Sequence, residues 1–275
     1  MCIRDRRKGV EEEKVQEAMI RLEEFLSQLH RSENTKRAYR QTLRAFERFL
    51  AGREPTEELA REFLAELSKR GLKPSSIGRH GNALRKYFKW LKKPIELELP
   101  SPKRKMPRWL DEEEVERLIN ACETPLEKAI EYVLLDTGMR VGELLRLKVK
   151  DIDFEEGFLL ITRKGGYQRW VPISEKALKV LKEYLDAEGI TKGRCFRISY
   201  SEVWRTLKEL GERAGLEIPL HPHLLRHTRA SQLRLEGVAL EDIKELLGHS
   251  NIQTTLIYAH IKPIDLKKKL RPILK

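Results

Sequence analysis

Residues 221–227 read His-Pro-His-Leu-Leu-Arg-His, residues 247–250 read Leu-Gly-His-Ser, and residues 254–260 read Thr-Thr-Leu-Ile-Tyr-Ala-His. His223 and Arg226 are three residues apart, so they would project from one face of a helix. Gly248 is a good helix stop, which places His249 in a turn. Tyr258 is expected about two turns into the next helix. One arginine, two histidines and a tyrosine on successive elements predict a phosphate site with a nucleophile close by.

These three motifs, in this order and near the C-terminus, resemble the tyrosine recombinase (phage integrase) family. Residues 137–144, Thr-Gly-Met-Arg-Val-Gly-Glu-Leu, resemble the family's first active-site motif and place Arg140 as its arginine. Lys164 stands where a family lysine reaches the active site from a β-hairpin. Arg163 occupies the place of the glycine that often precedes this lysine, and Arg229 replaces an aromatic residue usual in the family.

The resemblance implies a catalytic set of six residues: Arg140, Lys164, His223, Arg226, His249 and Tyr258. Tyr258 would be the nucleophile, His223 would assist as general acid or base, and His249 would donate a hydrogen bond to the phosphate. Lys164 would protonate the departing 5′ oxygen. Two arginines can neutralise the charge that builds on a phosphodiester without a metal. A 3′-phosphotyrosine link conserves bond energy, so no ATP or other cofactor is expected.

The fold predicted from the whole chain is mainly α. It combines an N-terminal four-helix (SAM-like) core-binding bundle with a mostly helical tyrosine-recombinase catalytic domain that carries a small antiparallel β-sheet. Apolar residues repeat at helical spacing in four N-terminal segments. These segments cover 15–29, the stretch after Ser32 or Asn34, the stretch after Thr56, and the stretch from Pro74.

The strand signal lies in the C-terminal half. Residues 158–162 and 170–173 are apolar and flank Lys164-Gly165-Gly166-Tyr167, which predicts a hairpin with glycines at its turn. Later helices are expected over 174–188, 199–214 and 221–236.

The predicted organisation has four parts: an extension over 1–12 that is disordered or non-native, a core-binding DNA-binding domain over 13–92, a linker over 93–107, and a catalytic domain with a C-terminal tail over 108–275. Four prolines and a basic run make the linker a semi-stiff connector. Residues 265–274 resemble the family's tail segment that docks into a neighbouring subunit; a self-packed terminal helix is the alternative.

The net charge of +12 and a pI of about 9.5 favour a polyanionic partner. Two of the predicted N-terminal helices carry basic outward positions, which favours phosphate contact over a merely solvated face. The residues predicted to contact DNA are Lys36, Arg37, Arg40, Arg44, Arg79, Arg85 and Lys86.

A metal site is the rival interpretation of His221, His223 and His227. Their spacing does not place all three on one helical face, and no cysteine or carboxylate cluster joins them. His227 is instead expected to be a core or supporting histidine that points away from Arg226. The three cysteines are scattered and odd in number, which favours a reducing compartment.

Within the family, the compact length and the C-terminal motifs most resemble the Xer type. The resemblance implies a cytoplasmic site-specific recombinase that resolves chromosome dimers at a palindromic dif-like site. It would act on double-stranded DNA as a homo-tetramer on two sites, and be a monomer or dimer when free. A phage or plasmid integrase, a type IB topoisomerase and a non-catalytic DNA-binding module remain as alternatives.

Overall fold

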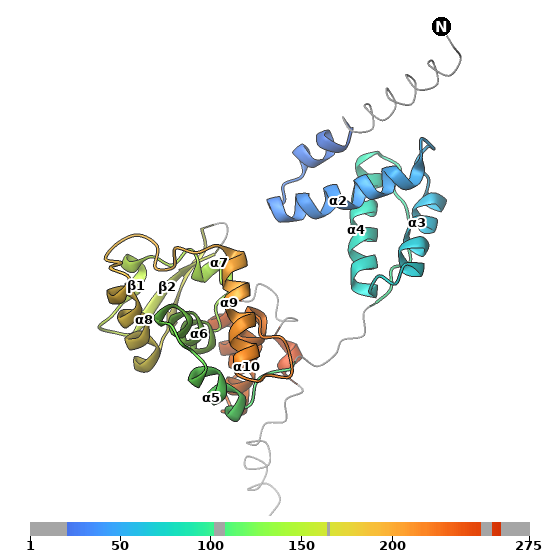
Figure 1. Ribbon diagram of the computed structural model, residues 1–275. Helices are drawn as coiled ribbons and strands as arrows, with labels where there is room; N and C mark the ends of the chain where they lie inside the picture. The colour runs from blue at the N-terminus through green and yellow to red at the C-terminus, as the bar shows by residue number, and fades with distance from the viewer. Residues whose placement is uncertain (1–20, 102–107, 164–165, 249–254, 260–275) are drawn as a thin grey trace, which may run out of the picture. The chain divides into compact units, whose positions relative to one another are not determined.

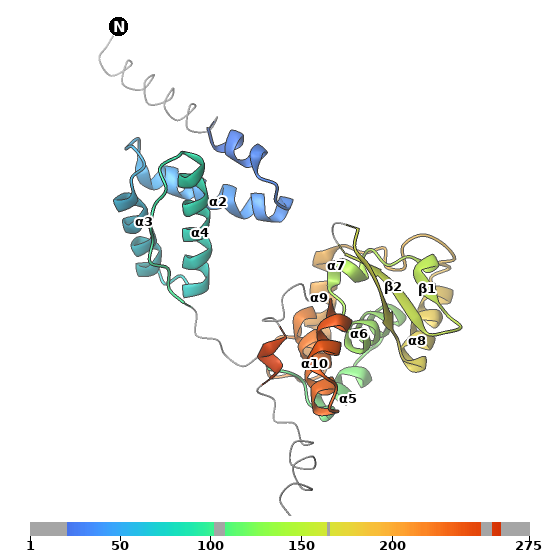
Figure 2. The same ribbon diagram turned by 180° about the vertical axis from the view of Figure 1, so that it is seen from behind.

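The computed structural model of the chain describes residues 21–101, 108–163, 166–248 and 255–259. The chain divides into two compact units, Met1–Arg104 and Lys105–Lys275, and each is described by itself. Figures 1 and 2 show the helices and strands of both units from opposite sides. Among the described helices, none combines the length and the apolar character that a membrane span requires.

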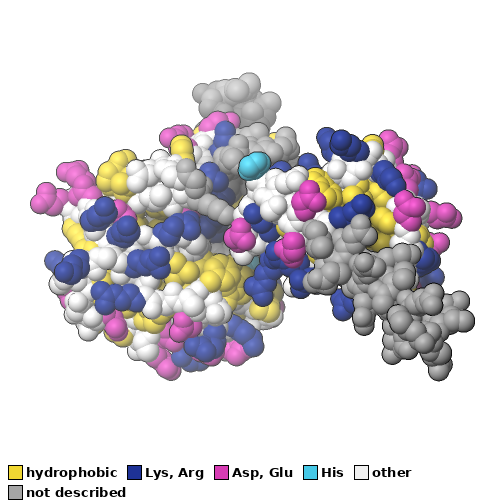
Figure 3. All heavy atoms as spheres, turned by 90° about the horizontal axis from the view of Figure 1, so that it is seen from above, with side chains coloured by type: hydrophobic (Ala, Val, Ile, Leu, Met, Phe, Trp, Pro, Cys, Tyr) yellow, Lys and Arg dark blue, Asp and Glu magenta, His cyan; other side chains and the backbone are white. Residues whose placement is uncertain are grey.

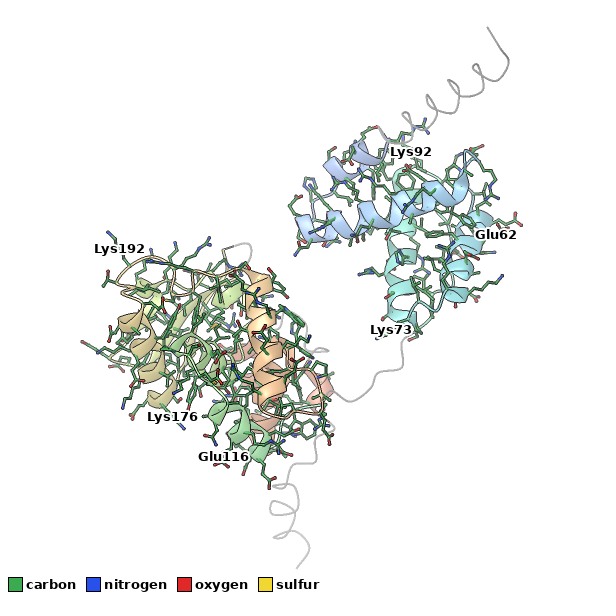
Figure 4. All side chains as sticks on the ribbon, viewed as in Figure 1. Glu62, Lys73, Lys92, Glu116, Lys176 and Lys192 are labelled. Atoms are coloured by element: carbon green, nitrogen blue, oxygen red, sulfur yellow. The ribbon has the colours of Figure 1, made fainter. Side chains whose placement is uncertain are left out.

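The N-terminal unit is a small helical bundle, as predicted. Residues 21–28 are helical, and they are followed by α2 (Glu33–Leu50), α3 (Glu57–Lys69) and α4 (Pro74–Trp90). The hydroxyls of Ser32 and Thr56 cap α2 and α3 by accepting backbone N–H groups of the first turn. Lys73 and Lys92, labelled in Figure 4, lie at the two ends of α4. The buried core includes Leu22, Phe25, Leu43, Phe46, Phe63, Leu84 and Phe88.

The segment that follows α4 packs onto this bundle. Leu97 is buried in the bundle core, and Ile95 and Leu99 lie against it. Gly81 on α4 permits this approach, because a Cβ built there would lie 2.1 Å from a methyl carbon of Leu99. The predicted linker began at residue 93. Its apolar first part, through Leu99, packs on the bundle and so belongs to the N-terminal unit. Residues 102–107 of that linker lie outside the described residues.

The larger unit is mostly helical, with one small sheet. Its helices are α5 (Glu112–Asn120), α6 (Pro125–Thr137), α7 (Val141–Leu144), α8 (Glu175–Ala187), α9 (Tyr200–Arg213), α10 (Pro222–Leu235) and α11 (Leu240–Leu247), with 3₁₀ helices η1 (Val149–Asp151) and η3 (Leu256–Tyr258). Helix α6 is central, since α8, α9 and α10 all pack against it. Figure 1 shows α6 between α8 and α10. The helices expected over 174–188, 199–214 and 221–236 are all present.

The sheet is antiparallel in the order β1 (Ile152–Asp153), β2 (Phe158–Thr162) and β3 (Gln168–Pro172). Strands β2 and β3 form the predicted hairpin, and the two-residue β1 was not predicted. Leu159 pairs with Val171 and Ile161 pairs with Arg169, and all four side chains face the interior. The alternation of β3 therefore buries a charged residue, Arg169, among apolar ones.

Tyr258 lies on the short 3₁₀ helix η3, and the first turn of the helix expected before it falls in residues 249–254, outside the described residues. Residues 249–254 and 260–275, which include the tail segment, lie outside the described residues. Helix α10 begins as expected, with Pro222 in its first turn. Its N-cap is His221, whose Nδ1 accepts the backbone N–H of Leu224 at 3.0 Å.

An unpaired carboxyl group lies in the core of the larger unit. Glu131 on α6 is 0% exposed, and neither of its oxygens has a hydrogen-bond partner among the described residues. Burial raises the pKa of Glu131 to about 8, against a partial opposing effect of Lys176 on α8. Lys176, labelled in Figure 4, places its ammonium 5.4 Å from the centre of the Tyr132 ring. Glu131 is therefore protonated in the folded protein at neutral pH.

Replacement of this carboxyl, Glu131→Gln, should flatten the dependence of stability on pH. Between about pH 5.5 and about pH 7.5 the folded wild type keeps a proton on Glu131 that the unfolded chain releases. The folded pKa is raised, so this group's contribution to stability falls as pH rises through that window. The fall is at most about 2.7 kcal/mol over two pH units, at 1.36 kcal/mol per unit.

The measurement is urea unfolding of both proteins at the two pH values. The exposed control Glu183→Gln should follow the wild type. An unchanged pH dependence in Glu131→Gln would show that Glu131 is ionised in the folded protein.

Candidate active site

The end of α6 positions Arg140. Gly138 adopts a left-handed conformation (φ 61°) and ends α6, which turns the chain so that Met139 enters the core. Arg140 then becomes the N-cap residue of α7, with its side chain 34% exposed. A Cβ at Gly138 would lie 2.6 Å from a methyl carbon of Leu247, so the glycine also allows α11 to approach. The first motif and the end of α11 are thus in direct contact.

A single buried carboxylate, Glu143, organises the basic residues near α7. Its oxygens accept two hydrogen bonds from the Arg169 guanidinium, at 3.1 and 3.3 Å. They also accept the backbone N–H of Arg140 at 3.0 Å and its guanidinium at 3.4 Å. Arg163 lies 4.0 Å away. Burial acts to raise the pKa of Glu143, but the hydrogen bonds and charges of Arg169 and Arg140 outweigh it and hold the pKa below its usual range.

Arg226 is the most deeply buried arginine of the site, at 4% exposure. Its two terminal nitrogens donate to the carbonyl oxygens of Gly138, at 2.6 Å, and Leu247, at 2.7 Å. Arg169 donates to the neighbouring carbonyl of Leu246 at 3.1 Å. These carbonyls belong to the C-terminal ends of α6 and α11, where the helix dipole favours cations. Arg226 therefore links the ends of two helices that lie far apart in the sequence.

Arg226 nevertheless has no carboxylate among its hydrogen-bond partners in the described residues. Burial, and then the positive charge of Arg140, lower the pKa of Arg226 to about 9, although the charge of Glu143 acts to raise it. An anion bound between Arg140 and Arg226 would stabilise both guanidinium groups. The two arginines therefore place positive charges close together.

His223 lies on the same face of α10 as Arg226, and its side chain is exposed. Partial desolvation by the surrounding protein lowers the pKa of His223, and the charges of Arg226 and Arg140 lower it further. A neutral imidazole therefore faces solvent beside both arginines at neutral pH. Arg140 and His223 mark the side from which an anion can approach.

Tyr258 is buried, at 1% exposure, and packs with Leu233, Ile243 and Leu247 of α10 and α11. Its hydroxyl lies 2.5 Å from Nδ1 of His227. Burial raises the pKa of Tyr258 to about 12, while the charge of Arg226 acts to lower it. The tyrosine of this chain is thus docked against its own α10, close to Arg226.

The structure brings together four of the six predicted catalytic residues: Arg140, His223, Arg226 and Tyr258. The other two, Lys164 and His249, lie outside the described residues. Three residues of the site were not predicted. Glu143 belongs to the first motif, but no role was inferred for it, and Arg169 could have been noticed as a charge at an inward position of β3. His227 was expected to be a core or supporting histidine that points away from Arg226, but its contact with the tyrosine hydroxyl was not predicted.

The predicted DNA-contacting residues of the N-terminal unit differ in how they are held. Arg40 donates two hydrogen bonds to Glu23 at 2.8 and 2.9 Å, and Arg44 lies 3.8 Å from the same carboxylate. Lys36 lies 3.6 Å from Glu33, and Arg85 donates to the carbonyl of Leu97.

Three others, Arg37, Arg79 and Lys86, are exposed and have no hydrogen-bond or ion-pair partner among the described residues. Figure 3 shows one face of the molecule, on which Lys and Arg side chains are prominent in both units. These three cations are free to contact a phosphate backbone.

Comparison with known proteins identifies the class to which this fold and site belong. Residues 108–263 match the profile of the phage integrase family, and residues 21–94 match the phage integrase N-terminal SAM-like domain. The chain therefore has the two-domain organisation of a DNA-cleaving and DNA-rejoining enzyme. It belongs to the phage integrase (tyrosine recombinase) family, and its relatives within that family are site-specific recombinases of the Xer type.

Two similar relatives are named tyrosine recombinase XerA. The one from Pyrococcus horikoshii is 35% identical over 265 residues, which cover 90% of this chain and 92% of the relative. The one from Pyrococcus furiosus is 37% identical over 265 residues, covering 90% and 91%. Among solved structures, a XerA recombinase has 29% identity and a TM-score of 0.56, covering 94% of this chain and 99% of that one. A XerH recombinase bound to its difH substrate shares the fold, with a TM-score of 0.70, 24% identity and coverage of 87% and 79%.

The buried Glu143 can be tested by Glu143→Gln. This change leaves Arg169, 7% exposed, without its charged partner in the interior, and a lost partner of a buried pair costs about 3–5 kcal/mol. We expect the free energy of unfolding in urea to fall by an amount of that order.

A matched control is Glu212→Gln, which removes an exposed i,i+4 pair with Lys208 and should change stability by less than about 1 kcal/mol. Equal effects of the two substitutions would mean that Glu143 does not stabilise the buried arginine.

Proposed function

We propose that this chain is a Xer-type recombinase that cleaves DNA with Tyr258 and resolves chromosome dimers at a palindromic dif-like site. The observation that carries the proposal is the position of Arg226, which is buried, donates its hydrogen bonds to backbone carbonyls and not to a carboxylate, and lies close enough to Arg140, His223 and Tyr258 to interact with their charges. A scissile phosphate held by Arg140 and Arg226 would lie beside the tyrosine hydroxyl. Because that hydroxyl is buried here, DNA binding must open access to it.

The chemistry follows from the groups present. The Tyr258 oxygen attacks phosphorus, the bond to the 5′ oxygen breaks, and the protein becomes joined to the 3′ phosphate. Arg140 and Arg226 neutralise the charge on the non-bridging oxygens, which such donors stabilise most in the transition state. His223, whose side chain is exposed to solvent, acts on the phosphate. Lys164 and His249, by resemblance, protonate the leaving oxygen and donate a hydrogen bond to the phosphate.

The assembly proposed is a homo-tetramer on two DNA sites, formed from monomers or dimers, in the cytoplasm where the chromosome lies. A lambda integrase of the same fold, 21% identical and with a TM-score of 0.69, was solved as a tetramer bound to a Holliday junction. A second XerH structure of the same fold, 22% identical and with a TM-score of 0.72, was solved with a palindromic difH substrate, which supports a dif-like palindrome as the site.

A phage or transposon integrase is the alternative within the family. The lambda and Tn1549 integrases share the fold at 20% and 18% identity, whereas several curated relatives named XerA, XerC or XerD exceed 30%. This difference favours the Xer role.

The nucleophile is tested by covalent trapping with Tyr258→Phe. A nicked suicide duplex that carries a dif-like palindrome is incubated with each protein in EDTA, and adducts are resolved by denaturing electrophoresis. The wild type should form a metal-independent adduct. Tyr258→Phe should bind the duplex equally well and form none, because it lacks only the hydroxyl. An adduct that survives in Tyr258→Phe would exclude Tyr258 as the nucleophile.

DNA contact by the N-terminal unit is tested with Arg37→Ala and Arg40→Ala. Arg37 is free of partners among the described residues, whereas Arg40 is held by Glu23. If Arg37 contacts one phosphate, its loss should weaken binding and reduce the slope of log affinity against log salt by about 0.9. Arg40→Ala should change the slope less, as measured by fluorescence anisotropy between low and moderate salt. An identical slope in Arg37→Ala and the wild type would place Arg37 away from the DNA.

A further inference from the structure

The hydroxyl of Tyr258 has one hydrogen-bond partner among the described residues, Nδ1 of His227 at 2.5 Å. The two rings lie 5.8 Å apart between their centres, at an interplanar angle of 55°. Tyr258 is buried, so bulk water does not reach this hydroxyl. No hydrogen bond joins Tyr258 to His223, and the His223 side chain faces solvent. Among the described residues, the base next to the proposed nucleophile is therefore His227.

We propose that His227 is a catalytic residue that accepts the proton of the Tyr258 hydroxyl during cleavage and returns it during rejoining. His223 then acts on the phosphate and on the departing 5′ oxygen instead of on the tyrosine. This inference rests on the proposed function, because it requires Tyr258 to be the nucleophile.

The position of His227 on α10 keeps it beside the reaction when DNA binds. It lies four residues after His223, so these two imidazoles project from one face of the helix, and it directly follows Arg226 in the chain. A phosphate held by Arg226 lies against this same face. Any position of Tyr258 from which it can attack that phosphate is therefore close to His227.

The step balances in atoms and charge. The O–P bond forms from the Tyr258 oxygen as the bond from phosphorus to the 5′ oxygen breaks, and the phenolic proton passes to Nδ1 of His227, which becomes an imidazolium. In rejoining, the 5′ oxygen attacks, the tyrosine oxygen leaves, and His227 gives the proton back. Neither direction consumes an oxidant, a metal or a nucleotide.

The charged groups around His227 define when it can act. Burial, followed by the charges of His223, Arg226 and the N-cap residue His221, lowers the pKa of His227 to about 4. The group that faces it from η3 is the Tyr258 hydroxyl. Without DNA, His227 is neutral and able to accept a proton but is a weak base. The negative phosphate would raise its pKa toward the usual range, so basicity would develop when the substrate is in place.

The test is the rate of covalent adduct formation by full-length His227→Asn on the nicked dif-like duplex, between about pH 5 and about pH 8. Asparagine keeps a hydrogen-bond acceptor near the hydroxyl but cannot take up its proton. We expect adduct formation at least about 10²-fold slower than in the wild type, the usual lower size of a general-base effect. The wild-type rate should fall as pH falls through the His227 pKa, and this fall should be absent in His227→Asn.

His223→Asn is the matched control, since it removes the other neutral imidazole of α10. It should keep the low-pH fall in rate, whatever its absolute activity. DNA binding and far-UV circular dichroism of each variant establish that it is folded. In His227→Ala, added imidazole should restore part of the rate, which a purely structural role of His227 would not produce.

Several outcomes overturn the inference. If His227→Asn keeps the wild-type rate and pH dependence, or if His223→Asn alone abolishes the low-pH fall, His227 does not accept the proton. Faster adduct formation in His227→Asn would show that the hydrogen bond only restrains the tyrosine. These results leave the loss of adduct in Tyr258→Phe unaffected. An adduct that persists in Tyr258→Phe overturns the nucleophile and this inference together.

Discussion

The pair of hydrogen bonds from Arg226 to the carbonyls of Gly138 and Leu247 is the constraint on which the larger unit depends. The guanidinium group of Arg226, a residue of α10, joins the end of α6 to the end of α11. A buried cation is costly unless polar groups surround it. The carbonyls at two helix ends supply that environment without a full negative charge. The arrangement holds the three helices in register and still leaves the arginine able to bind an anion.

Glu143 limits how much positive charge the interior must hold. It contacts Arg140, Arg163 and Arg169 directly and acts on Arg226 at longer range. Among the described residues, the carboxylate of Glu143 thus interacts with four guanidinium groups. The excess charge is fixed in place by the fold before any ligand arrives. Such preorganised charge stabilises a transition state more effectively than charge that must rearrange.

The sequence predicted the helical bundle, the β2–β3 hairpin and the helices after it, because apolar spacing, prolines and glycines act locally. It also predicted that Arg140, His223, Arg226 and Tyr258 meet, through motifs read against a known family. It did not predict the roles of Arg169 and His227, because each depends on contacts between residues far apart in the sequence. Arg169 contacts Leu246, and His227 contacts Tyr258, across 77 and 31 residues. The packing of Leu97 onto the bundle was missed for the same reason.

Without DNA, proton transfer from Tyr258 to His227 is unfavourable because the two groups have widely separated pKa values. Tyr258 has a pKa of about 12 and His227 a pKa of about 4. Moving the proton between them without DNA costs on the order of 10 kcal/mol, at 1.36 kcal/mol per pKa unit. Both values are displaced by burial, and the positive charges that lower the His227 pKa are those that a phosphate would neutralise. In the proposed reaction, a bound phosphate would raise the pKa of His227 and so reduce the difference between the two pKa values. Bond formation to phosphorus would lower the affinity of the tyrosine oxygen for its proton. Burial, which raises the pKa of Tyr258 and lowers that of His227, is thus the main obstacle to proton transfer in the protein without DNA.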